Sequence, residues 1–184
     1  MLETLIDLDK SFFIFLNSLG SEFFDSFWMF VTDKKSSIPL YFFLIYYIYK
    51  KLSNNDFLKY FILIIILIVF TDQFSGLFKD YFERFRPCHD SSINDSIRIV
   101  KEGCGGLYGF FSAHAANSFA LATFFYFSFR KFSSNFKYLF LWAIIVSYSR
   151  IYIGVHFPGD VIIGSCFGII TGYLFSIASI KIKF

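Results

Sequence analysis

Four stretches of this chain are each long and apolar enough to cross a lipid bilayer. They cover about residues 57–78, 107–129, 137–155 and 161–180, and a helix needs about 20 mostly apolar residues to span the hydrocarbon core. A fifth stretch, about residues 37–50, is shorter but uninterrupted. Apolar residues make up 56% of the 184, more than a soluble domain of this size can bury. The sequence therefore predicts one all-α integral membrane domain over residues 1–184, with about five transmembrane helices.

The first 35 residues are apolar but interrupted by polar groups. Residues 11–33 are long enough to cross a membrane, yet Asn17, Gly20, Glu22 and Asp25 lie in the middle of that stretch. Because such groups are costly in hydrocarbon, we expect amphipathic helices at the interface, and a sixth crossing stays open. The start of the chain is acidic and has no small-residue cleavage site, so we expect no removable signal peptide.

The basic residues indicate which side of the membrane each connection faces. Lysine and arginine gather at 50–56, at 130–137 and in the tail at 181–184, and these residues are enriched on the cytoplasmic side. The long loop that begins near residue 79 and the segment 149–160 would then lie on the outer side. The small formal charge of +3, spread over scattered cations, does not fit a nucleic-acid-binding protein.

The first of three polar clusters, KDYFERFRP, begins just after the apolar stretch 57–78. Lys79 and Arg86 are seven residues apart, so on a continuing helix they would share a face and could grip a phosphate. Helix ion pairs are the alternative, because Glu83 is four residues after Lys79 and Asp80 is four residues before Arg84.

The second cluster, GFFSAHAANSF, places Ser112 and His114 among small residues. Small residues in a membrane helix are typical of close helix packing. If a helix begins here, however, its free amide groups and Ser112 could hold an anion.

The third cluster, SRIYIGVHFPGD, contains Arg150, His156 and Asp160. The arginine could be an anchor at the membrane surface, and the aspartate could be the N-cap of the last helix. An aspartate four residues after a histidine can also hold the imidazole in one tautomer, as in many histidine nucleophiles and bases.

Together the three clusters deliver three cations, two histidines and a carboxylate to one surface, a set that suits an anionic phosphoryl group. Their order and spacing resemble the type 2 phosphatidic acid phosphatase (PAP2) superfamily, whose pattern is Lys-x6-Arg-Pro, then Pro-Ser-Gly-His, then Ser-Arg-x5-His-x3-Asp. The first and third motifs match in spacing. The second reads FSAH, with Phe111 and Ala113 in place of proline and glycine. The resemblance covers residues 79–160.

The resemblance implies a role for each motif residue. His156 would attack phosphorus and form a phosphohistidine, Asp160 would orient it, and His114 would protonate the leaving oxygen. Four further residues would bind the phosphate oxygens: Lys79, Arg86, Ser112 and Arg150. The resemblance implies neither a metal nor another cofactor.

Two features stand outside the motifs. Asp72 is seven residues before Lys79 on the same helical stripe, and it could support the cations or, with Gln73, hydrogen-bond between helices. Cys88 and Cys104 bracket the outer loop, where an oxidising setting favours a disulfide over two unrelated thiols. Such a bond would close a loop of about 17 residues and contribute ~3 kcal/mol by chain entropy.

The resemblance implies a phosphatase that acts on lipid phosphates or diphosphates at the outer leaflet of a bacterial inner membrane, without an obligatory protein partner. Undecaprenyl diphosphate is the leading predicted substrate, and lipid A 1-phosphate and phosphatidylglycerol phosphate are the alternatives. A lipid phosphotransferase and a non-catalytic membrane protein or transporter with the same fold stay open. Loss of His156, His114 or Arg150 would have signalled the non-catalytic case, and all three are present.

Overall fold

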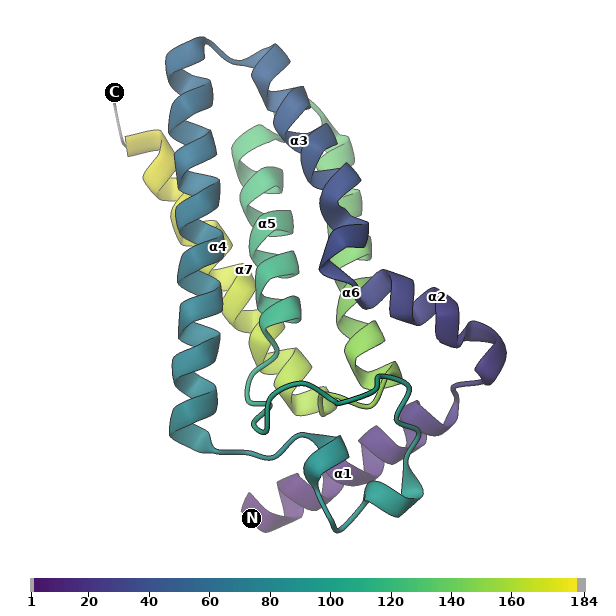
Figure 1. Cartoon of the computed structure of the whole chain (residues 1–184). Coiled ribbons are helices and arrows are strands. Elements are labelled where there is room, and N and C mark those ends of the chain that lie inside the picture. The colour runs from purple at the N-terminus through teal and green to yellow at the C-terminus, as the bar shows by residue number, and fades with distance from the viewer. Residues whose placement is uncertain (1, 182–184) are drawn as a thin grey trace.

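The structure is a computed structural model that describes residues 2–181, and it is helical over most of that range (Figure 1). Met1 and residues 182–184, which include Lys183 of the basic tail, lie outside the described residues. The helices are α1 (Leu2–Ser18), α2 (Glu22–Thr32), α3 (Ile38–Lys51), α4 (Asn54–Phe82), α5 (Ala113–Phe129), α6 (Tyr138–Tyr152) and α7 (Pro158–Lys181). Short 3-10 helices are η1 (Lys34–Ser37), η2 (Pro87–His89), η3 (Asn94–Ser96) and η4 (Ser134–Lys137). The predicted all-α architecture is confirmed.

Helix α5 lies in the middle of the bundle, with α4, α6 and α7 packed around it (Figure 1). Its small residues meet glycines of α7, and a Cβ atom at Gly164 would lie only 2.6 Å from the carbonyl oxygen of Ser112. Such residues let two membrane helices approach closely. The packing interpretation of the second cluster is therefore correct, and it places the start of α5 directly against α7.

Helices α4 and α7 are long and apolar enough to cross a membrane, with candidate spans at Asn54–Phe82 and Pro158–Ile180. The helices between them, α5 and α6, are shorter than the apolar stretches 107–129 and 137–155 suggested. α5 begins at Ala113 rather than at 107, because residues 107–109 are extended and pair with residues 84–86. α6 ends at Tyr152 rather than at 155, because Gly154 adopts a left-handed conformation with a φ of 84°.

The N-terminal segment forms two helices, not one, since the chain turns between Ser18 and Glu22. One straight helical crossing by residues 11–33 is therefore not present. The side chain of buried Asn17 donates to the carbonyl oxygens of Ile151 (3.2 Å) and Tyr152 (3.0 Å) and accepts from the amide of Arg98 (2.7 Å). The polar groups of this segment thus tie it to the loop between α4 and α5 and to the end of α6.

The loop between α4 and α5 lies beside α1 at one end of the bundle (Figure 1). A disulfide joins Cys88 to Cys104 within it. Ion pairs connect it to the N-terminal helices, with 2.7 Å between Lys10 and Asp90 and 3.0 Å between Arg98 and Asp25. This loop and α1 together cover the end of the bundle where the three polar clusters meet.

Candidate active site

The three polar clusters converge on one cavity of about 220 Å³. It lies where α4 and α6 end and where α5 begins. Six residues singled out in the sequence line it: Asp72, Lys79, Arg86, His114, Arg150 and His156. The other two, Ser112 and Asp160, are fully buried next to these residues. The structure therefore brings all the predicted site residues together.

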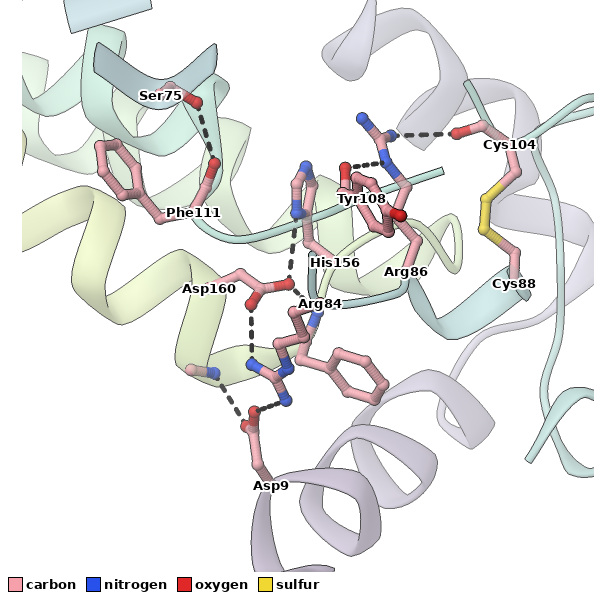
Figure 2. Close-up of polar contacts among 12 residues, drawn as sticks. Asp9, Ser75, Arg84, Arg86, Cys88, Cys104, Tyr108, Phe111, His156 and Asp160 are labelled. Carbon is pink, nitrogen blue, oxygen red and sulfur yellow. Dashed lines mark hydrogen bonds and ion pairs between the residues drawn. A yellow bond between two sulfur atoms is a disulfide. The ribbon is translucent and has the colours of Figure 1, made fainter. Parts of the chain in front are cut away.

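His156 and Asp160 form a buried pair behind the cavity (Figure 2). The imidazole Nδ1 lies 3.4 Å from Asp160 Oδ2, at the long end of hydrogen bonding, and that oxygen also accepts from the amide of Phe157 at 3.1 Å. Because Asp160 is the third residue of α7, it bonds back to the residue before the helix, as the acid of a capping box does. Asp160 is therefore not the N-cap residue, as one interpretation of the sequence held, but lies inside the first turn of α7, and it also faces His156.

The surroundings of His156 favour its neutral form. Burial lowers the pKa of the imidazole well below its usual range, and the positive charges of Arg150, Arg86 and Lys79 lower it further. A proton on Nδ1, the nitrogen that faces Asp160, leaves a lone pair on Nε2. Nε2 of a neutral imidazole can then act as a nucleophile.

Asp160 is held from its other side by Arg84, for which a helix ion pair with Asp80 was the alternative left open by the sequence. That alternative is wrong, because α4 ends at Phe82 and Arg84 turns toward α7 (Figure 2). Its Nη1 donates to Asp160 Oδ1 at 2.7 Å, and its Nη2 donates to Asp9 Oδ2 at 2.6 Å. The second oxygen of Asp9 accepts from the amide of Gly159 at 2.8 Å. Helix α1 thereby supports the carboxylate that faces His156.

Arg86 does not continue the α4 stripe that carries Lys79, as the spacing had predicted. The helix ends at Phe82, and Glu83 is left-handed with a φ of 47°. Arg86 lies instead in an extended segment, where its amide donates to the carbonyl of Leu107 at 3.1 Å. Its Nε and Nη1 donate to the carbonyls of Tyr108 (3.1 Å) and Cys104 (3.0 Å) (Figure 2). The disulfide-bonded loop, rather than a helix face, orients this guanidinium.

Buried polar atoms of Ser112 and Arg150 have no protein partner among the described residues. Ser112 precedes α5 and is fully buried, and its Oγ has no hydrogen bond there; neither has Nε of Arg150. The Nη1 of Arg150 donates to Thr32 Oγ1. Buried polar atoms are rarely left unpaired because desolvation costs about 1–3 kcal/mol each. Their position beside the first amides of α5 fits an anion-binding site.

Arg150 is only 3% exposed, so the interpretation of it as an anchor at the membrane surface is wrong.

Phe111, which stands where the family pattern has proline in the second motif, has a clear packing role. Phe111 is buried with its ring 5.3 Å from that of Phe78 and 5.0 Å from that of Phe167. Its carbonyl accepts from Ser75 Oγ at 2.9 Å (Figure 2). These contacts fix the backbone just before Ser112.

The comparisons with known proteins agree with this geometry. The family model of the PAP2 superfamily matches residues 57–183. This chain belongs to the PAP2 superfamily. The lipid A 4'-phosphatase of Bacteroides thetaiotaomicron is 37% identical over 95% of this chain and 78% of its own length. The lipid A 4'-phosphatase of Porphyromonas gingivalis is 31% identical, over 94% of this chain and 73% of its own.

Two crystal structures share the fold of this PAP2 protein. The phosphatidylglycerolphosphate phosphatase of Bacillus subtilis has a TM-score of 0.74 at 20% identity and covers 98% of this chain and 88% of its own. Aquifex aeolicus LpxE has a TM-score of 0.66 at 27% identity and covers 94% of both chains. The protein is a membrane lipid phosphatase, and the predicted superfamily and enzyme class are confirmed.

Several residues around the site of this PAP2 phosphatase were not identified from the sequence. Arg84 lies inside the first motif but looked like an ordinary helix charge. Lys34 and Lys101 line the cavity. Thr32 contacts Arg150, which also lines it, and Asp9 contacts Arg84. All four of these lie outside the three clusters, so no local pattern marks them.

Asp72 lines the cavity two helical turns before Lys79, and the two charges attract one another. That position agrees with support for the cations. Gln73 lines the neighbouring cavity.

One group of three potential metal ligands among residues 2–181 lies in the loop between α4 and α5, where ligand atoms of Cys88, His89 and Cys104 are within 4.8 Å of one another. The two sulfur atoms are joined in the disulfide, and a disulfide offers no thiolate to a metal. This group therefore does not form a metal site in the oxidised protein.

Proposed function

We propose that this PAP2 phosphatase removes the 4'-phosphate of lipid A at the outer leaflet of a bacterial inner membrane. The observation that carries the proposal is the 37% identity to a lipid A 4'-phosphatase over 95% of the chain. A second relative with that name is 31% identical over a similar share. Undecaprenyl diphosphate, the leading substrate expected from the sequence, has no support from these relatives. Lipid A therefore takes its place.

In the proposed mechanism, Nε2 of His156 attacks phosphorus and forms an N–P bond while the P–O bond to the lipid breaks. His114 donates a proton to the leaving oxygen, so dephosphorylated lipid is released as an alcohol. His114, now neutral, then takes a proton from water as that water attacks the phosphohistidine. The products are inorganic phosphate and free His156. Asp160 keeps Nε2 available throughout by holding Nδ1.

The charge that develops on phosphorus oxygens is neutralised by side chains in this proposal. Lys79, Arg86 and Arg150 line the cavity, and Ser112 and the first amides of α5 add donors. Fixed donors aimed at such charge are a large source of catalysis. Because these groups can do the work of a metal ion, we expect activity to persist in EDTA. A requirement for an added divalent ion after chelation would contradict this part of the proposal.

For the membrane arrangement we propose that α3 to α7 cross and that α1 lies at the outer interface. The connections that carry the basic clusters follow α3 and α5, so both lie at the end opposite the cavity. Cysteine at exposed Ser91 or at exposed Ser134, each in a Cys166→Ser background, tests the orientation with an impermeant maleimide on intact cells. Labelling at 91 alone is expected. Labelling at 134 alone would reverse the orientation.

Purified protein incubated with lipid A tests the substrate. We expect mass spectrometry to show loss of one phosphoryl group, located on the distal sugar by fragmentation, and His156→Ala protein to leave the lipid intact. Loss of the phosphoryl group from the other sugar would agree with a lipid phosphatase but would change the position at which it acts. Turnover of undecaprenyl diphosphate but not of lipid A would overturn the proposed substrate.

A further inference from the structure

Two lysines outside the three motifs line the same cavity as the phosphate-binding candidates. Lys34 comes from η1, between α2 and α3, and Lys101 comes from the outer loop between α4 and α5. They join Lys79, Arg86 and Arg150 around one space of about 220 Å³. The reaction proposed above uses the latter three and assigns no role to the two lysines.

The backbone around Lys34 is fixed next to Arg150. Thr32, two residues earlier, accepts a hydrogen bond from Arg150 Nη1. The carboxylate of Asp33 accepts from the amide of Lys35 at 2.9 Å, which caps η1. Lys34 lies between Asp33 and Lys35, the two residues that this bond joins. It also lines a second, larger cavity of about 320 Å³ that shares His114 with the first.

The backbone around Lys101 is fixed next to Arg86. The carbonyl of Lys101 accepts from the amide of Cys104 at 3.3 Å, and Cys104 is disulfide-bonded to Cys88. The carbonyl of Cys104 in turn accepts from Arg86 Nη1 at 3.0 Å. Burial lowers the pKa of Lys101, and the positive charges of Arg150 and Arg86 lower it further. The ammonium group of Lys101 is thus held against like charges.

Neither lysine is paired with a carboxylate among the described residues, although the negative charge of Asp33 acts on Lys101 from a distance. Among the described residues, neither ammonium group takes part in an ion pair or a hydrogen bond, whereas Lys10 of α1 pairs with Asp90 at 2.7 Å. Five cationic side chains and one carboxylate, that of Asp72, line the cavity, so positive charges exceed negative charges by four. The surplus is three if Asp33, which lines the larger cavity, is counted. A single phosphate monoester carries about −2 at neutral pH, so one phosphoryl group leaves the cavity positive.

We propose that Lys34 and Lys101 form a second phosphate subsite, which binds another phosphoryl group of the same lipid while the motif residues hold the one that is hydrolysed. The inference rests on the proposed lipid phosphatase function and narrows its substrates to lipids with two phosphoryl groups. The second group is either joined to the first as a diphosphate or carried elsewhere on the headgroup. In the second case, the larger cavity beside Lys34 offers room for the part of the headgroup between them.

The test compares wild type with Lys34→Gln, Lys101→Gln and the double variant, and uses Lys35→Gln as the matched control. Lys35 is exposed and adjacent to Lys34 but does not line the cavity. One arm measures kcat and KM for lipid A with two phosphates and for lipid A that carries the 4'-phosphate alone. The other arm measures inhibition of phosphate release by pyrophosphate and by inorganic phosphate.

With two phosphoryl groups, each lysine variant is expected to lose about tenfold in kcat/KM, mainly through KM, as for the loss of one hydrogen bond to a charged group. The loss for the singly phosphorylated lipid should be much smaller, and Lys35→Gln should match wild type. If the second phosphoryl group lies elsewhere on the headgroup, this difference should appear with the two forms of lipid A. If the two phosphoryl groups are joined directly, wild type should instead be inhibited more strongly by pyrophosphate than by phosphate, and the variants should lose that preference.

Equal losses for substrates with one and with two phosphoryl groups would overturn the inference, since the lysines would then serve the reacting phosphate. No loss in either arm would overturn it as well. If wild type turns over neither form of lipid A, the proposed substrate fails separately. The lipid arm is then repeated with undecaprenyl diphosphate and undecaprenyl phosphate, and the same comparison of losses decides the role of the lysines.

Discussion

The helices α4 to α7 and the segments packed on the cavity end of this bundle contribute to the active site in different ways. The bundle, with the short link between α6 and α7, carries the proposed acid His114 and the proposed nucleophile His156. The cavity-end segments, which are α1, η1 and the loop 83–112, add the proposed phosphate ligands Arg86 and Ser112 and surround the site with further charge. The nucleophile and the acid therefore come from the bundle, whereas the choice of substrate can differ in the cavity-end segments.

The largest effect is expected where the bundle supplies its nucleophile. His156→Ala should lower phosphate release at least about a thousandfold, as the loss of other covalent nucleophiles does. The control is His89→Ala, because His89 is exposed in the loop between α4 and α5. Phosphate release measured on both purified variants checks this. Substantial turnover by the His156 variant would show that the chemistry lies elsewhere.

Arg84 tests whether the cavity-end segments matter for the chemistry of the bundle. Arg84→Ala breaks the bonds to Asp160 and Asp9, so the carboxylate behind His156 loses its support. We expect kcat to fall about 10- to 100-fold, a range typical of the loss of a hydrogen-bond partner that orients a side chain of the site.

Two results separate positioning by Arg84 from a general loss of structure. Added guanidinium should restore part of the activity of Arg84→Ala protein, and Arg130→Ala, at an exposed position on the other end of α5, should behave as wild type. A normal kcat for Arg84→Ala would mean that α1 and the loop only cover the site.

The Cys88–Cys104 disulfide is expected to have a smaller effect on activity than on stability. Cys88→Ser with Cys104→Ser should lower the free energy of unfolding by ~3 kcal/mol, measured by thermal unfolding in detergent. Phosphate release should fall only severalfold, because the carbonyl of Cys104 also positions Arg86. Cys166→Ser is the control, since this cysteine is a free thiol on α7. An unchanged free energy of unfolding would show that the disulfide does not stabilise the protein.

The smallest change concerns the protonation of His156. Because burial and the neighbouring cations lower its pKa, the imidazole should stay neutral below pH 6.5, where an ordinary histidine gains its proton. Its positive form should appear only as the pH falls further. Nitrogen-15 NMR of labelled protein, with the signal assigned by His156→Asn, measures this directly. A titration at or above 6.5 would contradict the proposed neutral nucleophile.

The sequence predicted the bundle well because each of its signals is local. Apolar runs mark α3 to α7, and the motif spacings identify His156 and Asp160 without any tertiary information. The position of Arg86 could not be read from its seven-residue spacing. Its location depends on a chain reversal at Glu83 and on pairing with residues 107–109, both of which place it by contacts distant in sequence.

The cavity-end segments were predicted less well for the same physical reason. Asp9 contacts Arg84 across 75 residues, and Thr32 contacts Arg150 across 118. Nothing in the sequence near Asp9 or Thr32 distinguishes them from ordinary surface residues of an amphipathic helix. Their roles follow only from how α1 and α2 pack on the end of the bundle.

The most direct test of the account is to trap the covalent intermediate on the bundle. His114→Ala protein lacks the proposed base of the second step, so water should attack the phosphohistidine only slowly once it has formed. The variant is mixed with lipid A, kept at neutral to alkaline pH, digested and analysed by mass spectrometry. The account predicts one phosphoryl group on the peptide that contains His156, absent from the His114→Ala, His156→Ala double variant. A phosphoryl group on another residue, or turnover without any labelled His156 peptide, would contradict it.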